Sequence, residues 1–88
     1  PTLTDGLTHH PLIRNVTKLG RGHEADIRID DPGVSRVHCE VVVGAPTVVR
    51  DLGSTNGLSV DGSRVTQATL VDGSTVTIGQ TTLVYRSG

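Results

Sequence analysis

Apolar and polar residues alternate along several short segments of this chain, which is the pattern of a β-strand with one buried face. Ala25, Ile27 and Ile29 alternate with charged residues, and the same period of two recurs at residues 37–43 and 75–78. Further segments that we expect to be extended are residues 12–19, 47–51, 58–60 and 64–65 and the stretch around Leu83 and Tyr85. Short strands therefore account for most of the chain.

Turn-forming residues separate these segments. Asp31-Pro32-Gly33, Gly44-Ala45-Pro46 and Gly79-Gln80 interrupt the pattern, and Asp61-Gly62 is a strong signal for a two-residue hairpin. No segment of about ten residues carries the apolar stripe of a helix. We therefore predict an all-β fold, an antiparallel β-sandwich of about 10–11 short strands with its binding loops at one end. The first ten residues suggest no clear element.

Composition supports one small, aliphatic domain. The chain has 88 residues, its commonest residues are the β-branched Val and Thr, and Gly and Pro together make 15 of them. Tyr85 is the only aromatic residue, so the core must be built from Val, Leu, Ile and Ala. We expect residues 1–88 to form a single domain that is a fragment of a larger protein.

Charge limits the classes of ligand. The formal net charge is −1, which excludes a global field for nucleic acid or membrane and requires any anion site to be local. Stacking of single-stranded nucleic acid needs aromatic residues that are missing. No apolar run has the length of a membrane span and no signal peptide is evident, so we expect a cytoplasmic domain, or a nuclear one in a eukaryote.

No metal or cofactor is expected. Cys39 is the only cysteine, which rules out an internal disulfide and favours a small buried apolar residue. His9, His10 and His23 show no metal-ligand spacing with Cys39.

Three predicted loops carry groups that could bind an anion. Arg21 lies between two glycines, Ser35 and Arg36 follow Asp31-Pro32-Gly33, and Thr55 and Asn56 lie in a polar turn. They offer a guanidinium fork, hydroxyls, a carboxamide and backbone N–H groups. Loops of a sandwich cluster at its ends, so these segments can converge on one ligand.

The combination resembles the forkhead-associated (FHA) domain, a family of phosphothreonine-binding β-sandwiches. The motifs occur in family order as Gly20-Arg21, Ser35-x-x-His38 and Asn56-Gly57, followed by the segment VDGSTVTIG at residues 71–79. The resemblance covers residues 19–85, whereas residues 1–18 match poorly. The ligand contacts that it implies are Arg21 and Ser35 on the phosphate, Arg36 and Thr55 as further contacts, and Asn56 on the peptide backbone.

The resemblance also implies supporting roles and a class of partner. His38 would brace the binding loops, and Gly20 and Gly57 would provide backbone geometry that a Cβ would oppose. The partner would be a phosphothreonine-containing protein, such as a kinase or a kinase substrate, bound by a monomeric domain. A preference for phosphothreonine over phosphoserine would come from an apolar gap for the threonine methyl, to which Val34 and Leu58 could contribute.

Enzymatic interpretations of the same residues are weaker. Gly20-x-Gly22-x-x-Ala25 fits a loose dinucleotide fingerprint, but a strand follows it where a helix is required. The segment GSTNG carries Thr55 at the nucleophile position of an elbow motif, again without a helix. Ser35, His38 and Asp51 have the residue types of a triad without a substrate cleft. The remaining alternative is a structural or protein-interaction β-domain that binds independently of phosphate.

Overall fold

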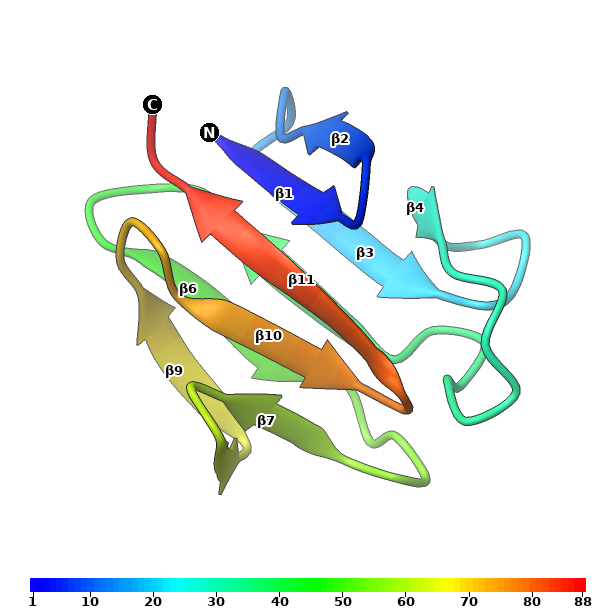
Figure 1. Cartoon of the computed structure of the whole chain (residues 1–88). Coiled ribbons are helices and arrows are strands. Elements are labelled where there is room, and N and C mark those ends of the chain that lie inside the picture. The colour runs from blue at the N-terminus through cyan, green and yellow to red at the C-terminus, as the bar shows by residue number, and fades with distance from the viewer.

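In the computed structural model, which describes residues 1–88, the chain forms eleven strands and no helix (Figure 1). The predicted all-β sandwich is confirmed. No helix is therefore long and apolar enough to cross a membrane. One sheet contains, in spatial order, β2 (Thr8–Pro11), β1 (Thr2–Asp5), β11 (Thr81–Arg86), β10 (Thr75–Ile78), β7 (Leu58–Val60) and β8 (Ser63–Val65). The other contains β4 (Ile27–Arg28), β3 (Val16–Gly20), β5 (Cys39–Val42), β6 (Thr47–Asp51) and β9 (Gln67–Leu70).

One pair of strands departs from the antiparallel arrangement that we predicted. β4 runs parallel to β3, and its ladder is only two residues long although residues 25–30 alternate throughout. Before this ladder, Asp26 bonds to Lys18 through both its side chain and its backbone: the Asp26 carboxylate accepts the Lys18 N–H at 2.8 Å, and the Asp26 N–H donates to the Lys18 carbonyl at 2.8 Å. The loop of residues 21–26 therefore leaves β3 and returns alongside it.

The core between the sheets is aliphatic, as the composition predicted. Sixteen buried apolar residues form one cluster, with Leu19 and Val41 from one sheet and Val76 and Leu83 from the other fully buried. The Tyr85 hydroxyl donates to Thr47 Oγ1 at 3.1 Å and links the two sheets. This rigid body carries the loops that connect the strands.

Two polar residues of the segment at 37–43 are buried, although alternation places them on the polar face. His38 is 0% and Glu40 9% exposed. Glu40 lies in register between Lys18 and Arg50, and Arg50 Nε donates to its carboxylate at 3.1 Å. Neighbouring side chains on the outer face therefore cover Glu40, whereas loops cover His38.

The amino-terminal residues form a hairpin that the pattern did not reveal. β1 and β2 pair antiparallel around a turn in which Gly6 has a φ of 57°. Leu3 pairs with Tyr85 of β11 and is fully buried, so the hairpin extends the six-stranded sheet. The only indication of this hairpin in the sequence is the apolar residue Leu3 before the turn-forming pair Asp5-Gly6.

Four connections gather at one end of the sandwich. They are the β3–β4, β4–β5 and β6–β7 loops and the β10–β11 turn at Gly79-Gln80, while the two chain termini lie at the other end (Figure 1). The Asp61-Gly62 turn between β7 and β8 has φ values of 51° and 83°, which confirms the predicted hairpin. All three candidate loops therefore occupy the same end.

Candidate functional site

Backbone hydrogen bonds place Arg21 directly beside Ser35. The Arg21 N–H donates to the Ser35 carbonyl and the Gly22 N–H to the Arg36 carbonyl, each at 3.0 Å. Two of the three candidate loops, β3–β4 and β4–β5, thus pair like short strands. The exposed guanidinium groups of Arg21 and Arg36 therefore emerge from adjacent backbone positions.

Gly20 allows this close pairing. A Cβ built on Gly20 would lie 2.1 Å from the Arg36 carbonyl oxygen and 2.9 Å from Val37 Cα. Contacts this short involve backbone atoms that cannot move aside without separating the loops. Any larger residue at this position would therefore displace Arg36, and Ser35 with it.

A hydrogen bond from the third loop ends on Ser35. The Thr55 N–H donates to Ser35 Oγ at 3.1 Å. Because a hydroxyl both accepts and donates, this bond leaves the Ser35 proton free for another acceptor. Ser35 is half-buried and Thr55 is exposed, so the proton and the Thr55 hydroxyl lie at the edge of solvent.

Asp51 shapes the β6–β7 loop that carries Thr55. Its carboxylate accepts the N–H groups of Gly53 at 3.0 Å and Ser54 at 3.1 Å, together with the Ser54 hydroxyl. Burial alone would raise the pKa of Asp51, but these hydrogen bonds and the backbone donors outweigh burial and hold that pKa below its ordinary value. Ser54 Oγ in turn accepts the Gly57 N–H at 2.9 Å, which closes the turn.

Asn56 spans two loops. Its Nδ2 donates to the Gly33 carbonyl at 2.8 Å, although the side chain is exposed. The carboxamide oxygen takes part in no hydrogen bond within the chain and can accept an N–H from a ligand. The bond to Gly33 fixes the orientation in which that oxygen is presented.

His38 joins the Ser35 loop to the Asn56 loop. Its Nδ1 accepts the Ser35 N–H at 3.0 Å, and its Nε2 lies 2.6 Å from the Gly57 carbonyl oxygen. Since Nδ1 must accept, Nε2 carries the proton and donates to Gly57. The ring is fully buried, and both nitrogens are satisfied by the backbone.

Gly57 adopts a conformation that other residues avoid. Its φ is 87°, and a Cβ would lie 2.6 Å from Arg64 Nη2. The guanidinium of Arg64, which reaches back from β8, therefore lies against Gly57 and next to Asn56. The sequence motifs do not include Arg64, because its position depends on the pairing of β7 with β8.

Asp31 is a second residue near the site that lies outside the sequence motifs. Its buried carboxylate accepts the Gly33 N–H at 2.8 Å, the Gln80 N–H at 2.8 Å and the Thr81 hydroxyl at 2.7 Å. The hydrogen bonds from Thr81, Gly33 and Gln80 lower the pKa of Asp31. Asp31 therefore ties the Ser35 loop to the β10–β11 turn.

Val34 and Leu58, which could contribute to a gap for the threonine methyl, are not exposed at the loop end of the free domain. Each is 1% exposed and belongs to the core between the sheets. Val34 precedes Ser35 and Leu58 follows Gly57. The side chains of both point into the core, where they anchor the loops. Any contact with a ligand methyl must come from other atoms at this end.

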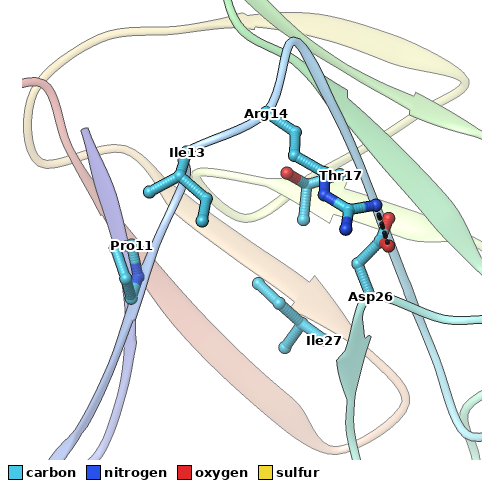
Figure 2. Close-up of a pocket in the computed structure, with 6 residues that line it drawn as sticks. All are labelled: Pro11, Ile13, Arg14, Thr17, Asp26 and Ile27. Carbon is cyan, nitrogen blue, oxygen red and sulfur yellow. Dashed lines mark ion pairs between the residues drawn. The ribbon is translucent and has the colours of Figure 1, made fainter.

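Two hollows open on the surface. One, of about 390 Å³, is lined by Arg21, Gly22, His23, Arg28, Asp30 and Arg36 at the loop end. The other, of about 230 Å³, is lined by Pro11, Ile13, Arg14, Thr17, Asp26 and Ile27 (Figure 2). In Figure 2, Arg14 reaches across the second hollow to Asp26, at 3.5 Å. The two hollows share no residue, and only the first includes candidate site residues.

Together these residues form a compact group of hydrogen-bond donors. Arg21, Ser35 and Thr55 come from three loops and are linked by two backbone donors, and Asn56 follows directly. Arg21 has no carboxylate partner, whereas Arg36 pairs with Glu24 at 3.1 Å. Such a cluster suits a ligand with several acceptor oxygens and a negative charge.

The fold and these loops agree with one protein family. The sequence model of the FHA domain matches residues 17–79, so the chain belongs to the FHA domain family. The FHA domain-containing protein FhaA of Mycobacterium tuberculosis is 38% identical over 69 residues, which are 77% of this chain and 13% of FhaA. The glycogen accumulation regulator GarA of Mycolicibacterium smegmatis is 41% identical over 78 residues, which are 88% of this chain and 49% of GarA. The chain thus spans less than half the length of these relatives.

Solved FHA domains share the whole fold. A chain from a structural and functional study of phosphothreonine-dependent FHA domain interactions superimposes with a TM-score of 0.93 at 32% identity, covering 99% of this chain and 95% of the other. The FhaA FHA domain complexed with the intracellular domain of Rv3910 gives 0.89 at 32% identity, covering 94% and 96%. The coverage includes the β1–β2 hairpin that precedes the matched family segment.

Proposed function

We propose that this domain binds proteins phosphorylated on threonine, with the phosphate held between Arg21, Ser35 and Thr55. The observation that carries the proposal is the junction of the three loops at Ser35, whose carbonyl accepts from Arg21 and whose hydroxyl oxygen accepts from Thr55. A phosphate beside Ser35 would meet a free hydroxyl proton and an unpaired guanidinium. The two structural relatives described above support the assignment. One comes from a study of phosphothreonine-dependent FHA domain interactions, and the other is an FHA domain complexed with the intracellular domain of a protein.

The proposed contacts match the chemistry of the ligand. A phosphothreonine carries about −1.5 to −2 charges and three strong acceptor oxygens at neutral pH. Arg21 can donate to two of these oxygens, and the Ser35 and Thr55 hydroxyls can donate to the remainder. Arg36 lies beside them and would contribute after its exposed ion pair with Glu24 opens.

Asn56 is proposed to hold the peptide backbone next to the phosphothreonine. Its Nδ2 is engaged by the Gly33 carbonyl, so the free carboxamide oxygen would accept a backbone N–H of the peptide. His38, Gly20 and Gly57 would support the site through the loop geometry described above. The peptide would then lie extended across the loop end.

The same geometry argues against catalysis by Ser35 and His38. His38 accepts from the Ser35 backbone N–H rather than from the hydroxyl, and Asp51 bonds to Ser54 instead of His38. A catalytic triad would need a hydrogen bond between the Ser35 hydroxyl and His38 and another between His38 and Asp51, and the structure contains neither. We therefore propose a monomeric, non-catalytic recruiting domain in the cytoplasm, whose partner is a threonine kinase or its substrate.

The decisive test is a titration with four versions of one peptide, carrying phosphothreonine, phosphoserine, glutamate or threonine at the central position. Phosphothreonine should bind most tightly, and phosphoserine several-fold more weakly if the lost methyl, worth roughly 0.8 kcal/mol, is buried on binding. Glutamate should bind far more weakly because it offers less charge and two oxygens. Equal affinity for the phosphorylated and unphosphorylated peptides would instead favour a phosphate-independent interaction domain.

A further inference from the structure

A basic hollow adjoins the proposed phosphothreonine site without coinciding with it. Its volume is about 390 Å³ and none of its six lining residues is apolar. Arg21 and Arg36 belong to both sites, whereas Ser35, Thr55 and Asn56 do not line the hollow. A phosphate bonded to Ser35 and Thr55 would therefore not fill the hollow. The hollow lies on the side of Arg21 that faces away from Asn56.

Arg28 is the residue that distinguishes this hollow. Its Nε donates to the Arg21 carbonyl at 3.1 Å, which fixes the guanidinium while leaving both Nη groups without a partner in the chain. Arg28 makes no ion pair, in contrast to the four arginines that pair with carboxylates at Arg14, Arg36, Arg50 and Arg86. No intramolecular carboxylate accounts for the charge of Arg28.

The acidic groups nearby do not cancel this charge. Asp30 is the only carboxylate in the lining, against three arginines, and it forms no hydrogen bond or ion pair with Arg28. Glu24 lies at the rim, where it pairs with Arg36 at 3.1 Å. His23 adds a further donor. With Arg21 engaged by the phosphothreonine, a second anion would therefore meet the unpaired guanidinium of Arg28.

We infer that the hollow binds a second anionic group of the same ligand, with Arg28 as its main contact. The group would be a carboxylate or phosphate on a side chain close to the phosphothreonine, on the side away from Asn56. The inference rests on the proposed function, since the peptide must first be held at Ser35. It makes the preferred ligand an acidic or doubly phosphorylated segment.

The test uses alanine-based phosphothreonine peptides in which one glutamate is moved from four residues before the phosphothreonine to four after it. Wild-type domain should bind about fivefold more tightly when the glutamate occupies one or two adjacent positions on one side only. A second phosphate at that position should give a larger gain because it carries more charge. The gain should shrink as salt is added.

Arg28→Gln isolates the second contact, since glutamine can still donate to the Arg21 carbonyl. This variant should lose the gain from the second anion while binding the parent peptide, which carries the phosphothreonine as its only anionic side chain, within about twofold of wild type. Arg28→Lys should keep most of the gain. Arg86→Gln is the control. It also removes one positive charge, but at the end of β11 that is remote from the loop end (Figure 1), so this variant should bind like wild type.

The outcomes separate this inference from the function on which it rests. If the parent peptide binds but no position of the second anion improves affinity, the inference is wrong and the phosphothreonine site stands. If Arg28→Gln weakens every peptide equally, Arg28 only positions Arg21. If the parent phosphothreonine peptide fails to bind wild type at all, both proposals are wrong.

Discussion

His38 is a buried side chain that joins the loops of the proposed binding site. Its two ring nitrogens require opposite partners, and the structure supplies a donor from Ser35 and an acceptor from Gly57. These partners come from two different loops, the one that carries Ser35 and the one that carries Asn56. Removing the ring would leave two backbone groups unpaired at the point where these loops meet.

His38→Ala should lower stability and ligand binding together. We expect a loss of about 2–4 kcal/mol of unfolding free energy from the cavity and the unpaired backbone groups. In a domain of this size the melting temperature should fall by more than about 8 °C. Ser35→Ala, which deletes only a half-buried hydroxyl, should weaken phosphopeptide binding with little change in melting temperature. Equal thermal stability of His38→Ala and wild type would refute the bracing role.

Arg21→Ala should abolish most phosphopeptide affinity while the fold is retained. The guanidinium is exposed and unpaired in the free domain, so its loss leaves no buried group unsatisfied. Losing a charge-assisted contact typically costs about 1.5–3 kcal/mol, a reduction in affinity of at least tenfold. Isothermal titration calorimetry measures the affinity, and circular dichroism checks the fold. Arg86→Ala is the matched control, and unchanged binding by Arg21→Ala would exclude it as a phosphate ligand.

Polar side chains near the ends of strands hold the loops of this domain in place through hydrogen bonds. Asp31 is the clearest case. It follows β4 and reaches the turn between β10 and β11, so two loops distant in sequence share one carboxylate. A Cβ on Gly79 would lie 2.9 Å from Asp31 Oδ2, which shows how closely the turn approaches. The position of Ser35 therefore depends on a turn that carries none of the proposed ligand contacts.

Protonation of Asp31 should destabilise the domain. Its hydrogen bonds lower the folded-state pKa below the unfolded value of about 3.9. The folded state then binds fewer protons than the unfolded state between these values, so the stabilisation is present above about pH 4 and is lost as pH falls through the folded-state pKa.

Thermal melts between about pH 2 and 7 measure this effect. Asp31→Asn should be less stable than wild type at neutral pH and should show a shallower loss of stability in acid. Asp51 also has a lowered pKa, so part of the acid dependence will remain. Asp72→Asn, which alters an exposed ion pair with Arg86 and an exposed hydrogen bond from the Ser87 N–H, is the control. Parallel pH profiles for Asp31→Asn and wild type would contradict the role of the carboxylate.

Strands whose signals are local were predictable, and those whose pairing is non-local were not. β6 and β7 have the predicted bounds, because alternation and the Asp61-Gly62 turn are encoded within a few residues. The β1–β2 hairpin depends on β11 at the other end of the chain, and the length of β4 is set by its parallel pairing with β3 rather than by its own residues. For the same reason the motifs led to Arg21, Ser35 and Asn56 but not to the residues placed beside them by folding, namely Arg28, Asp31 and Arg64.

Charge is distributed unevenly over the whole molecule. The chain contains seven arginines and has a net charge of −1. Four arginines pair with carboxylates, and the other three are Arg21, Arg28 and Arg64. All three lie at the loop end: Arg21 and Arg28 line the basic hollow, and Arg64 lies against Gly57. The uncompensated positive charge is therefore concentrated where the phosphopeptide is proposed to bind.

This arrangement predicts that salt will weaken binding much more than it weakens the fold. Raising ionic strength from about 0.1 to 1 M shortens the Debye length from about 10 to 3 Å, which screens exposed arginines from a phosphate but leaves the aliphatic core intact. Affinity for a phosphothreonine peptide should fall about tenfold or more, because several cations contribute. The melting temperature should change little over the same range.

Two variants test whether the salt dependence arises at the loop end or over the whole surface. Arg64→Gln removes an unpaired cation beside Asn56 and should flatten the plot of log affinity against log salt concentration. Arg86→Gln removes a paired cation 3.7 Å from Asp72 at the opposite end and should leave that slope unchanged. If both variants flatten the slope equally, the ligand responds to the total charge of the domain. A difference confined to Arg64→Gln would show that the field which attracts the phosphopeptide is local, as a domain with a negative net charge requires.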